Sequence, residues 1–325
     1  MRIFSDIIIS ALVLKRRIDI KTMSPKVAVI VLNYNGTADT LECLRSLTRC
    51  TYDNVLIIVV DNASADADAL AYAVRNEFPK IHFLPRTENT GFSGGNNAGI
   101  RYALEHGSDY VVLLNNDTTV DPDFITRMIA AAHSDEHIGI VGAKIYFYTE
   151  PDRIWFNGAD FSWRDGGKHF QYGEQDAAPH EQTVIPTPFV TGCAMLITKT
   201  VIEKIGLLEK AFFMYYEDID YCLRAQRAGF ALRIAQGAHV WHKVSRSSAG
   251  MGAPRVQYYH VRNALLLTSR NASVFVKIGV YAWSVLHYIK QIVKRMIMPK
   301  TRDISIMIMR GIADFYREKF GKLQE

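Results

Sequence analysis

One stretch of the sequence, LLNNDTTVDP at residues 113–122, changes abruptly from apolar residues to amides and a carboxylate. Asn115, Asn116 and Asp117 stand together where the apolar run ends. A carboxylate flanked by amides could hold a hard divalent cation beside a phosphate, because such cations prefer oxygen ligands. The same residues also suit an ordinary polar loop, so this stretch alone leaves both interpretations open.

A second stretch with chemical potential is RTENTGFSGGNNAGI at residues 86–100, just ahead of a predicted helix. Glycine lets a ligand approach the backbone closely, and the start of a helix offers unpaired N–H groups to phosphate oxygens. The spacing excludes the dinucleotide fingerprint GxGxxG, and no Gly-Lys-Ser/Thr follows to make a Walker loop. We expect a phosphate-binding turn of another class, although glycine-rich turns are common.

Three acids, Glu217, Asp218 and Asp220, stand within four positions ahead of Arg224 and Arg227. Acids at a helix N-terminus are favoured by the helix dipole, which is a sufficient structural explanation. Aromatic residues precede them, however, and an acid beside apolar walls makes a usable general base. The stretch is therefore a candidate for proton abstraction.

Two histidines, His239 and His242, stand in the stretch AHVWHK. An imidazole nitrogen is a common metal ligand, but a lone histidine is more often a surface residue or a satisfied core residue. Only a carboxylate brought close by the fold would turn one of these side chains into a ligand.

Three apolar runs predict the elements that would position these residues. Each run is rich in β-branched residues and lacks alternation, which is typical of strands covered on both faces in a parallel sheet. The runs span residues 27–32, 55–60 and 110–114, with helical patterns at 40–47, about 66–77 and about 96–105. This alternation indicates right-handed βαβ units, whose ligands bind beyond the carboxyl ends of the strands.

Polar residues follow each of these strands: NYNG at 33–36, DNASAD at 61–66 and NND at 115–117. For any one of them, the polarity of ordinary loops is a sufficient explanation. Three polar ends aligned at one sheet edge favour a shared binding site instead.

The later chain predicts hairpins or a mixed-sheet extension at residues 138–170, where aromatic and glycine-rich runs are short. A strand and a helix follow at 193–206, then a polar helix at about 217–228, which Gly229 ends, and a strand at 230–235. From 274 to 298 polar residues recur near helical spacing, which predicts an amphipathic helix ended by Pro299.

The basic character of the chain belongs to its tail. The net charge is +5, and from Lys277 onward there are ten Lys or Arg against four Asp or Glu. A helix with an apolar face and a cationic stripe could lie in a membrane interface, attracted by anionic lipid, or could pack onto the domain with its stripe in water. The sequence leaves both readings open.

Length and composition predict one catalytic-size domain of 325 residues with a tail. The four cysteines show no CxxC spacing, which suits a reducing compartment, so we expect a cytoplasmic protein. The apolar run at 7–14 is too short to span a bilayer. It could be an interfacial anchor, but an ordinary N-terminal extension over residues 1–25 is favoured.

Taken together, the order of these motifs resembles the inverting glycosyltransferases of family 2, in particular their rhamnosyltransferase-like branch. The resemblance runs from about residue 27 to 262 and includes the stretch YYHVRN. It implies a GT-A fold, an α/β architecture with a Rossmann-like, mostly parallel sheet, flanking helices and a small mixed-sheet extension. It also implies a catalytic domain at 26–262, followed by a basic, amphipathic helical tail at 263–325.

The resemblance assigns roles to residues of this chain. It implies a nucleotide-sugar donor held by Asn33, Asn35, Asp61, Asn62, Asn89, Gly91, Gly95, Asn97 and Asn115. Asp117 matches the family's metal-binding acid and His242 a later metal-side histidine, so we expect Mg²⁺ or Mn²⁺. Asn115 stands where a first aspartate is common, which leaves more of the coordination to phosphate and water.

Asp218 matches the catalytic base, with Glu217 beside it as the alternative. The implied reaction moves a sugar, L-rhamnose from dTDP-rhamnose as the best candidate, to a glycan or lipid-linked acceptor in cell-surface polysaccharide synthesis. The enzyme could be peripheral on the inner face of the plasma membrane, and no nucleic-acid partner is expected. The alternatives are a sugar-nucleotidyltransferase and a non-catalytic nucleotide-sugar binder of the same fold.

Overall fold

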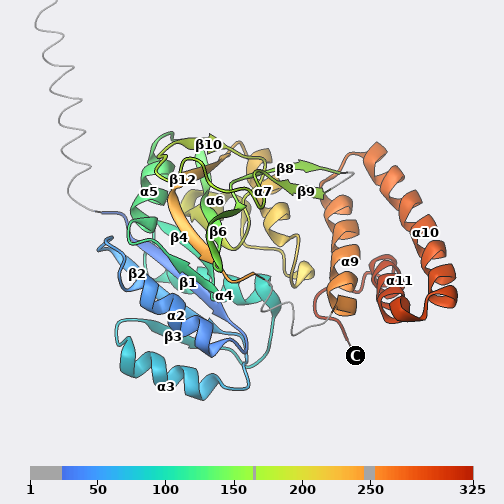
Figure 1. Ribbon diagram of the computed structural model, residues 1–325, viewed down its shortest axis with the longest axis horizontal. Helices are drawn as coiled ribbons and strands as arrows, with labels where there is room; N and C mark the ends of the chain where they lie inside the picture. The colour runs from blue at the N-terminus through green and yellow to red at the C-terminus, as the bar shows by residue number, and fades with distance from the viewer. Residues whose placement is uncertain (1–23, 164–165, 245–252, 325) are drawn as a thin grey trace, which may run out of the picture.

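The structure is a computed structural model that describes residues 24–163, 166–244 and 253–324. The described chain forms one large sheet with flanking helices and a helical tail at one end (Figure 1). This is the α/β architecture expected from the sequence. Residues 1–23 lie outside the described residues, and with them the choice between an interfacial anchor and an ordinary extension.

The three apolar runs form neighbouring parallel strands in the sheet. These strands are β1 (Val27–Asn33), β2 (Val55–Asp61) and β4 (Tyr110–Asn115). Their side chains are almost all buried, as a sheet covered on both faces requires. The register pairs Asn33 with Asp61 and Leu32 with Asn115, so the polar strand ends meet at one edge as predicted.

The rest of the ten-stranded sheet is mixed. β11 (Ala194–Thr198) runs antiparallel to β4 and to β6 (Ile138–Phe147), while β12 (Ala231–His242) runs parallel to β6. The other members are β3 (His82–Pro85), β5 (Thr118–Val120), β7 (Glu150–Phe156) and β10 (Val184–Pro186), and β8 (Ala159–Ser162) pairs with β9 (Gly166–His169) as a separate hairpin. The mixed extension is confirmed, and the last strand runs on from residue 235 to His242.

Six helices of the described chain alternate with the strands of the sheet, and α4 begins earlier than predicted. They are α2 (Thr37–Leu47), α3 (Ala67–Glu77), α4 (Gly91–Glu105), α5 (Phe124–His133), α6 (Lys199–Ile205) and α7 (Glu217–Arg227). The predicted start of α4 near Asn96 is wrong, because the glycines lie inside the helix. A Cβ at Gly95 would stand 2.4 Å from Leu32, so the glycine lets α4 pack closely on β1.

The helical tail is confirmed as α9 (Ala253–Asn271), α10 (Val274–Ile297) and α11 (Arg302–Tyr316) (Figure 1). The expected boundary after Arg262 falls inside the continuous helix α9. α9 and α11 bury apolar faces against each other and the domain. Among the helices of the described chain, none is long and apolar enough to cross a membrane.

Candidate active site

The edge formed by β1, β2 and β4 is organised by Asn33, which is fully buried. Its amide nitrogen donates to Asp61 Oδ1 at 2.7 Å and to Ser64 Oγ at 3.0 Å. Its amide oxygen accepts from Thr40 Oγ1 at 2.9 Å. Asn33 thus fixes the strand ends and their loops, and its own polar atoms are already engaged.

The loop after β1 presents a neighbouring amide, Asn35, on the surface. Asn35 has a φ of 54°, a left-handed conformation that asparagine tolerates better than most residues. Its side-chain oxygen accepts from Ala65 N at 2.9 Å, which ties the loop after β1 to the loop after β2. Among the predicted donor-side residues, Asn35 is therefore one that faces solvent.

Asn62 and Asn89 hold the start of α4. Asn62 donates to Asn89 Oδ1 at 3.0 Å and accepts from Thr90 N at 3.1 Å. Gly91 N donates to Asn89 Oδ1 at 2.9 Å, and Ser93 N donates to a carbonyl of the loop before α7 at 3.3 Å. The expectation of unpaired N–H groups is therefore wrong for Thr90, Gly91 and Ser93.

Gly91 and Asn97 join α4 to the segment that leads into α7. Gly91 has a φ of +72°, and a Cβ there would stand 2.2 Å from Phe213 O. Asn97 is buried and exchanges two hydrogen bonds with the backbone of Leu208, at 2.8 and 3.0 Å. The predicted donor loop is thus brought into contact with the segment that carries the acids.

Asp117 and His242 lie side by side although they are far apart in sequence. Asp117 Oδ1 and His242 Nε2 are 3.2 Å apart, and both side chains are buried. Burial lowers the pKa of His242, but Cys193 and the Asp117 carboxylate outweigh that effect and raise the pKa to about 10. The carboxylate partner that would make His242 a ligand is therefore present.

The donor atoms of this pair can be tested against a divalent cation. Asp117 Oδ2 and His242 Nδ1 are buried without a hydrogen-bond partner among the described residues, so both retain free binding capacity. The same part of the chain contains no group of three or more His, Cys, Asp or Glu placed to hold a metal. The residues thus fit a cation that draws the rest of its ligands from phosphate and water.

The loop before α7 is strained and is held from the tail. Phe213, Tyr215 and Tyr216 all have φ between 66° and 71°, where side chains are disfavoured. Asn263 of α9 is fully buried and donates to the carbonyls of Phe212, Met214 and Tyr215 at 2.7–3.1 Å. Arg262 also donates to Phe212 O, at 3.0 Å. The start of α7 is therefore positioned by α9.

The three acids of α7 have three different environments. Asp218 is partly exposed and accepts from Gly192 N at 3.0 Å and Ile219 N at 2.8 Å. Glu217 is buried, and one of its oxygens has no partner among the described residues. Asp220 is ion-paired with Arg224 at 2.8 Å, which identifies it as a structural residue.

Burial raises the pKa of both Glu217 and Asp218, and more strongly for Glu217, where the charge of Asp218 adds to the effect. For Asp218, the backbone N–H donors from Gly192 and Ile219 oppose the rise, because they stabilise the carboxylate. Asp218 is therefore the acid that ionises more readily of the two.

We expect Glu217→Gln to stabilise the fold increasingly as the pH rises. The folded-state pKa of Glu217 lies above its unfolded value, so the wild type loses stability between these two values. The difference in unfolding free energy should grow by about 1.4 kcal/mol per pH unit in that window. Urea unfolding at several pH values would measure it, and a difference that is independent of pH would contradict the burial argument.

Gly192 and Cys193 connect the two halves of the site. Gly192 N donates to Asp218, and Cys193 O accepts from the backbone N of Asn115 at 2.9 Å. A Cβ at Gly192 would lie 2.8 Å from the tip of the Phe92 ring, which would have to shift to make room for it. The two residues just before β11 therefore bring α7 to the end of β4.

Two aromatic residues beside the site were not predicted from the sequence. The Trp155 ring lies 4.7 Å from the His242 ring and 5.3 Å from the His169 ring, centroid to centroid. His169 Nδ1 contacts Trp155 O at 3.1 Å, and burial lowers its pKa. Both residues come from the aromatic hairpin region, whose sequence carries no catalytic spacing, so only the long-range packing reveals them.

Known proteins resemble the chain over most of its length. The low-salt glycan biosynthesis hexosyltransferase Agl10 of Haloferax volcanii is 27% identical over 259 residues, which cover 79% of each chain. The N-acetylglucosaminyl-diphospho-decaprenol L-rhamnosyltransferase of Mycobacterium tuberculosis is 23% identical over 273 residues, which cover 77% of this chain and 86% of the relative.

Among solved structures, the mannosyltransferase PcManGT from Pyrobaculum calidifontis, in complex with GDP-Man and Mn²⁺, has a similar fold. The TM-score is 0.58 at 14% identity, over 92% of this chain and 89% of that one. The GT-A fold expected from the sequence is confirmed.

The family model for glycosyl transferase family 2 matches residues 28–206, from β1 to the end of α6. The matched residues include the three polar strand ends and Asp117. This match covers more than half of the chain, and the curated relatives are themselves sugar transferases. The chain is therefore a glycosyltransferase that belongs to glycosyl transferase family 2.

Proposed function

We propose that the enzyme is an inverting glycosyltransferase that moves a sugar from a nucleotide-diphosphate donor to a hydroxyl of a glycan or lipid-linked acceptor. The observation that carries the proposal is the partly exposed Asp218, which Gly192 and the adjoining Cys193 link to the same sheet edge as Asp117 and His242. A base and a charged donor site are what a single displacement requires.

Asp218 is the proposed base. Its carboxylate takes the proton of the acceptor hydroxyl, whose oxygen bonds to the anomeric carbon as the bond from that carbon to the diphosphate oxygen breaks. One displacement inverts the configuration, and no covalent sugar–enzyme intermediate is needed. Glu217 is the weaker candidate, because it is more deeply buried and its pKa is raised more strongly.

Asp117 and His242 are proposed to hold Mg²⁺ or Mn²⁺ beside the donor diphosphate. When bound, such an ion supplies positive charge that stabilises the departing diphosphate. His242 would then have to give up the proton that its raised pKa retains, so binding should release a proton.

We expect Asp117→Asn to weaken Mn²⁺ binding by at least about tenfold, because the change removes a charged oxygen ligand. Wild-type affinity should rise between about pH 6 and pH 9 as His242 becomes easier to deprotonate. Electron paramagnetic resonance of free Mn²⁺ in the presence of nucleoside diphosphate would measure both effects. Asp123→Asn is the matched control, because it changes a half-exposed carboxylate six residues further along the chain. An equal loss of Mn²⁺ affinity in both variants would contradict the assignment.

The donor is proposed to be dTDP-rhamnose. The name of the L-rhamnosyltransferase relative from M. tuberculosis supports the sugar, and that of another relative, the dTDP-rhamnosyl transferase RfbF of Shigella flexneri, supports the nucleotide. The name of the M. tuberculosis relative also specifies a diphospho-decaprenol acceptor, which supports a lipid-linked acceptor here. We propose a role in cell-surface polysaccharide synthesis, with the enzyme in the cytoplasm and peripheral on the inner face of the plasma membrane. Trp155 and His169, beside the metal-side histidine, are candidates for the acceptor wall.

The test is transfer by the purified protein with a panel of nucleotide sugars and a membrane-lipid extract as the acceptor source, with and without EDTA. We expect one donor to release nucleoside diphosphate and label a lipid product, with inversion at the anomeric carbon. Release with no donor in the panel, or retention of configuration, would reject the proposed reaction. A different preferred donor would reject the choice of rhamnose alone.

A further inference from the structure

The outer helix of the tail, α10, has its apolar side chains on the outside. Only two of its residues, Ser284 and Gln291, are buried, and both are polar; the whole helix lies within the described residues. By contrast, α9 buries Leu265, Leu266 and Leu267, and α11 buries apolar residues in the same way. A helix surrounded by water would turn its apolar face inward, so this arrangement needs a cause.

Polar contacts fix the orientation of α10. Ser284 Oγ lies 2.7 Å from Tyr316 OH on α11, and the Tyr281 ring packs near the Phe315 ring, 5.8 Å between centroids. Gln291 is buried on the same side of the helix as Ser284 and contacts His287 one turn earlier on α10, at 3.2 Å. The inward face is therefore occupied, and the opposite face has no partner within the described chain.

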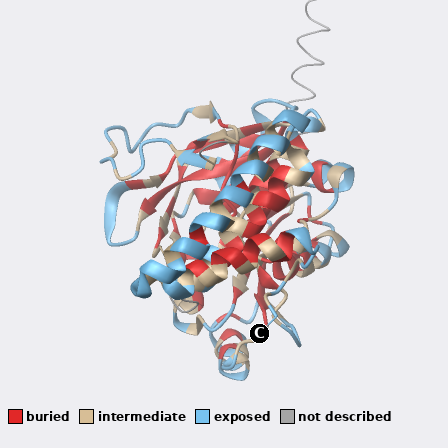
Figure 2. Cartoon of the chain, turned by 90° about the vertical axis from the view of Figure 1, so that its right-hand side faces the viewer, coloured by how far each residue is buried: buried red, intermediate tan, exposed pale blue. Residues whose placement is uncertain are grey.

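The outward face is large and continuous along α10. Six of its exposed members, spread over the length of the helix, are Phe275, Ile278, Leu286, Ile289, Val293 and Met296. Phe275 is 83% exposed and Met296 78%. Figure 2 looks onto the tail from the right-hand side of Figure 1 and shows much of its front surface exposed. A contiguous apolar surface of this kind marks an interaction site.

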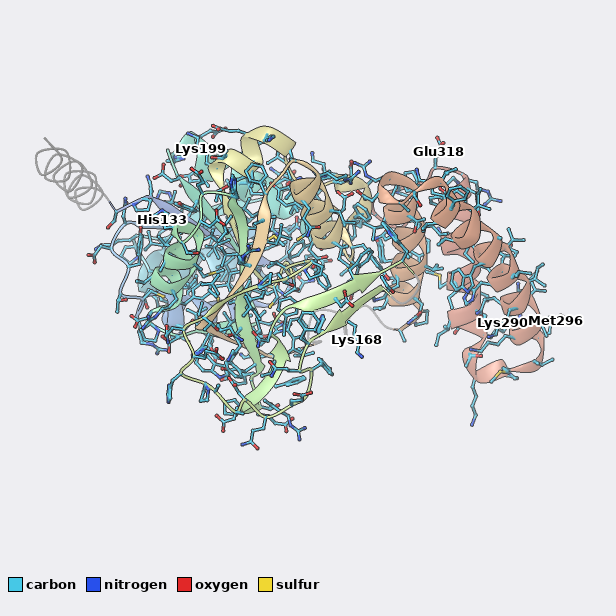
Figure 3. All side chains as sticks on the ribbon, turned by 90° about the horizontal axis from the view of Figure 1, so that it is seen from above. His133, Lys168, Lys199, Lys290, Met296 and Glu318 are labelled. Atoms are coloured by element: carbon cyan, nitrogen blue, oxygen red, sulfur yellow. The ribbon has the colours of Figure 1, made fainter. Side chains whose placement is uncertain are left out.

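The charges of α10 indicate what covers this face. The helix contains Lys277, Lys290, Lys294 and Arg295 and no acidic residue. Figure 3 places Lys290 and Met296 at the outer end of the tail, away from the sheet. By helical spacing Lys290 and Lys294 flank the apolar face, whereas Lys277 and Arg295 lie on the side of Ser284 and Gln291. In a two-fold dimer through the apolar face, the flanking lysines of the two copies would approach one another, which is unfavourable. An anionic surface complements both the apolar stripe and the cations.

We infer that α10 docks the enzyme on an anionic lipid surface, lying in the plane of the interface with its apolar face among the acyl chains. Trp283, 51% exposed, has the amphipathic ring that is enriched at that depth. Lysines within the helix oppose its insertion across a bilayer but suit a helix parallel to the surface. The inference does not depend on the identity of the donor or the acceptor.

The test is flotation of the full-length protein with vesicles of phosphatidylcholine alone, or of phosphatidylcholine mixed with phosphatidylglycerol, at low and high salt. We expect the wild type to bind the anionic vesicles and to be released in part by salt. Leu286→Asp combined with Met296→Asp should weaken binding at least about tenfold, since both side chains leave the acyl region. Lys290→Gln combined with Lys294→Gln should weaken it by about fivefold per cation.

Matched controls lie on α3 and the loop after it, at the opposite end of the molecule from the tail (Figure 1). Tyr72→Asp changes an apolar residue that is 71% exposed, and Arg75→Gln with Lys80→Gln removes two exposed cations. Both controls should bind vesicles within about twofold of the wild type. Thermal unfolding of each variant verifies the fold.

Three outcomes would overturn the inference. One is a wild type that ignores anionic vesicles, and another is an α10 variant that binds as the wild type does. The third is a wild-type dimer in sedimentation velocity that Leu286→Asp dissociates, without vesicle binding, which would identify a second copy of the chain as the occupant. Flotation measures vesicle binding and does not require transfer, so a variant that has lost transfer activity still tests the inference.

Discussion

Asp218→Asn is expected to lower kcat by about 10²–10⁴-fold, the range typical of a lost general base, while changing donor affinity little. The amide keeps the size of the carboxylate, and its single oxygen can keep one of the two hydrogen bonds, from Gly192 N or from Ile219 N, which now reach different oxygens. What it loses is the capacity to take a proton. Single-turnover transfer and equilibrium binding of the donor found in the panel would separate the two effects.

Glu217→Gln is the informative comparison, because it makes the same chemical change one residue earlier. If Asp218 is the base, the Glu217 variant should retain most of its turnover, since Glu217 is buried and its pKa is raised more strongly than that of Asp218. A loss in Glu217→Gln as large as that in Asp218→Asn would contradict our assignment. A loss of donor affinity in Asp218→Asn equal to the loss of kcat would instead indicate a role in binding.

Asn263→Ala is expected to destabilise the protein by about 2–6 kcal/mol, at about 1–3 kcal/mol for each carbonyl left without its donor. The carbonyls of Met214 and Tyr215 lose their bond from Asn263, while Phe212 O keeps its bond from Arg262. The strained loop should also relax, which would move Asp218. Urea unfolding and kcat measured on the folded fraction would report the two consequences.

Thr268→Ala provides a matched control on the same helix. Thr268 is buried like Asn263, but among the described residues its hydroxyl bonds to Ala264 O alone, within α9, at 2.8 Å. It should cost about 1 kcal/mol and leave kcat unchanged. If Asn263→Ala behaves the same way, the loop does not depend on α9 for its shape.

The sequence predicted the parts of the fold that follow from local pattern. Apolar runs identified β1, β2 and β4, because strands covered on both faces need no alternation, and their polar ends marked the edge of the sheet. The prediction from sequence was wrong where one residue type serves two structural purposes, as glycine does in loops and at close helix contacts. The glycines before Asn96 suggested a loop, but Gly95 serves to bring a helix close to Leu32.

The candidate site was predicted only as a set of separate motifs. Nothing in the sequence shows that Asp117 and His242 lie 3.2 Å apart, since 124 positions separate them and the contact depends on how β5 pairs with β12. Nor could it distinguish Asn33 and Asn97, whose amides are engaged by the protein, from Asn35, which is exposed. These distinctions come from burial and hydrogen bonding. The roles assigned to these residues stay predictions.

The attachment of α9 to the loop before α7 also fixes the distance between Asp218 and the outer helix α10. α9 carries Asn263, which donates hydrogen bonds to that loop. α9 also packs on α11, where Gly311 permits close contact, because a Cβ there would lie 2.6 Å from Val261. α10 in turn packs on α11. A protein bound to the surface through α10 would therefore hold Asp218 at a fixed height above that surface. Acceptors whose reacting hydroxyl stands at that height would be used, and those with a longer or shorter glycan between lipid and hydroxyl would be passed over.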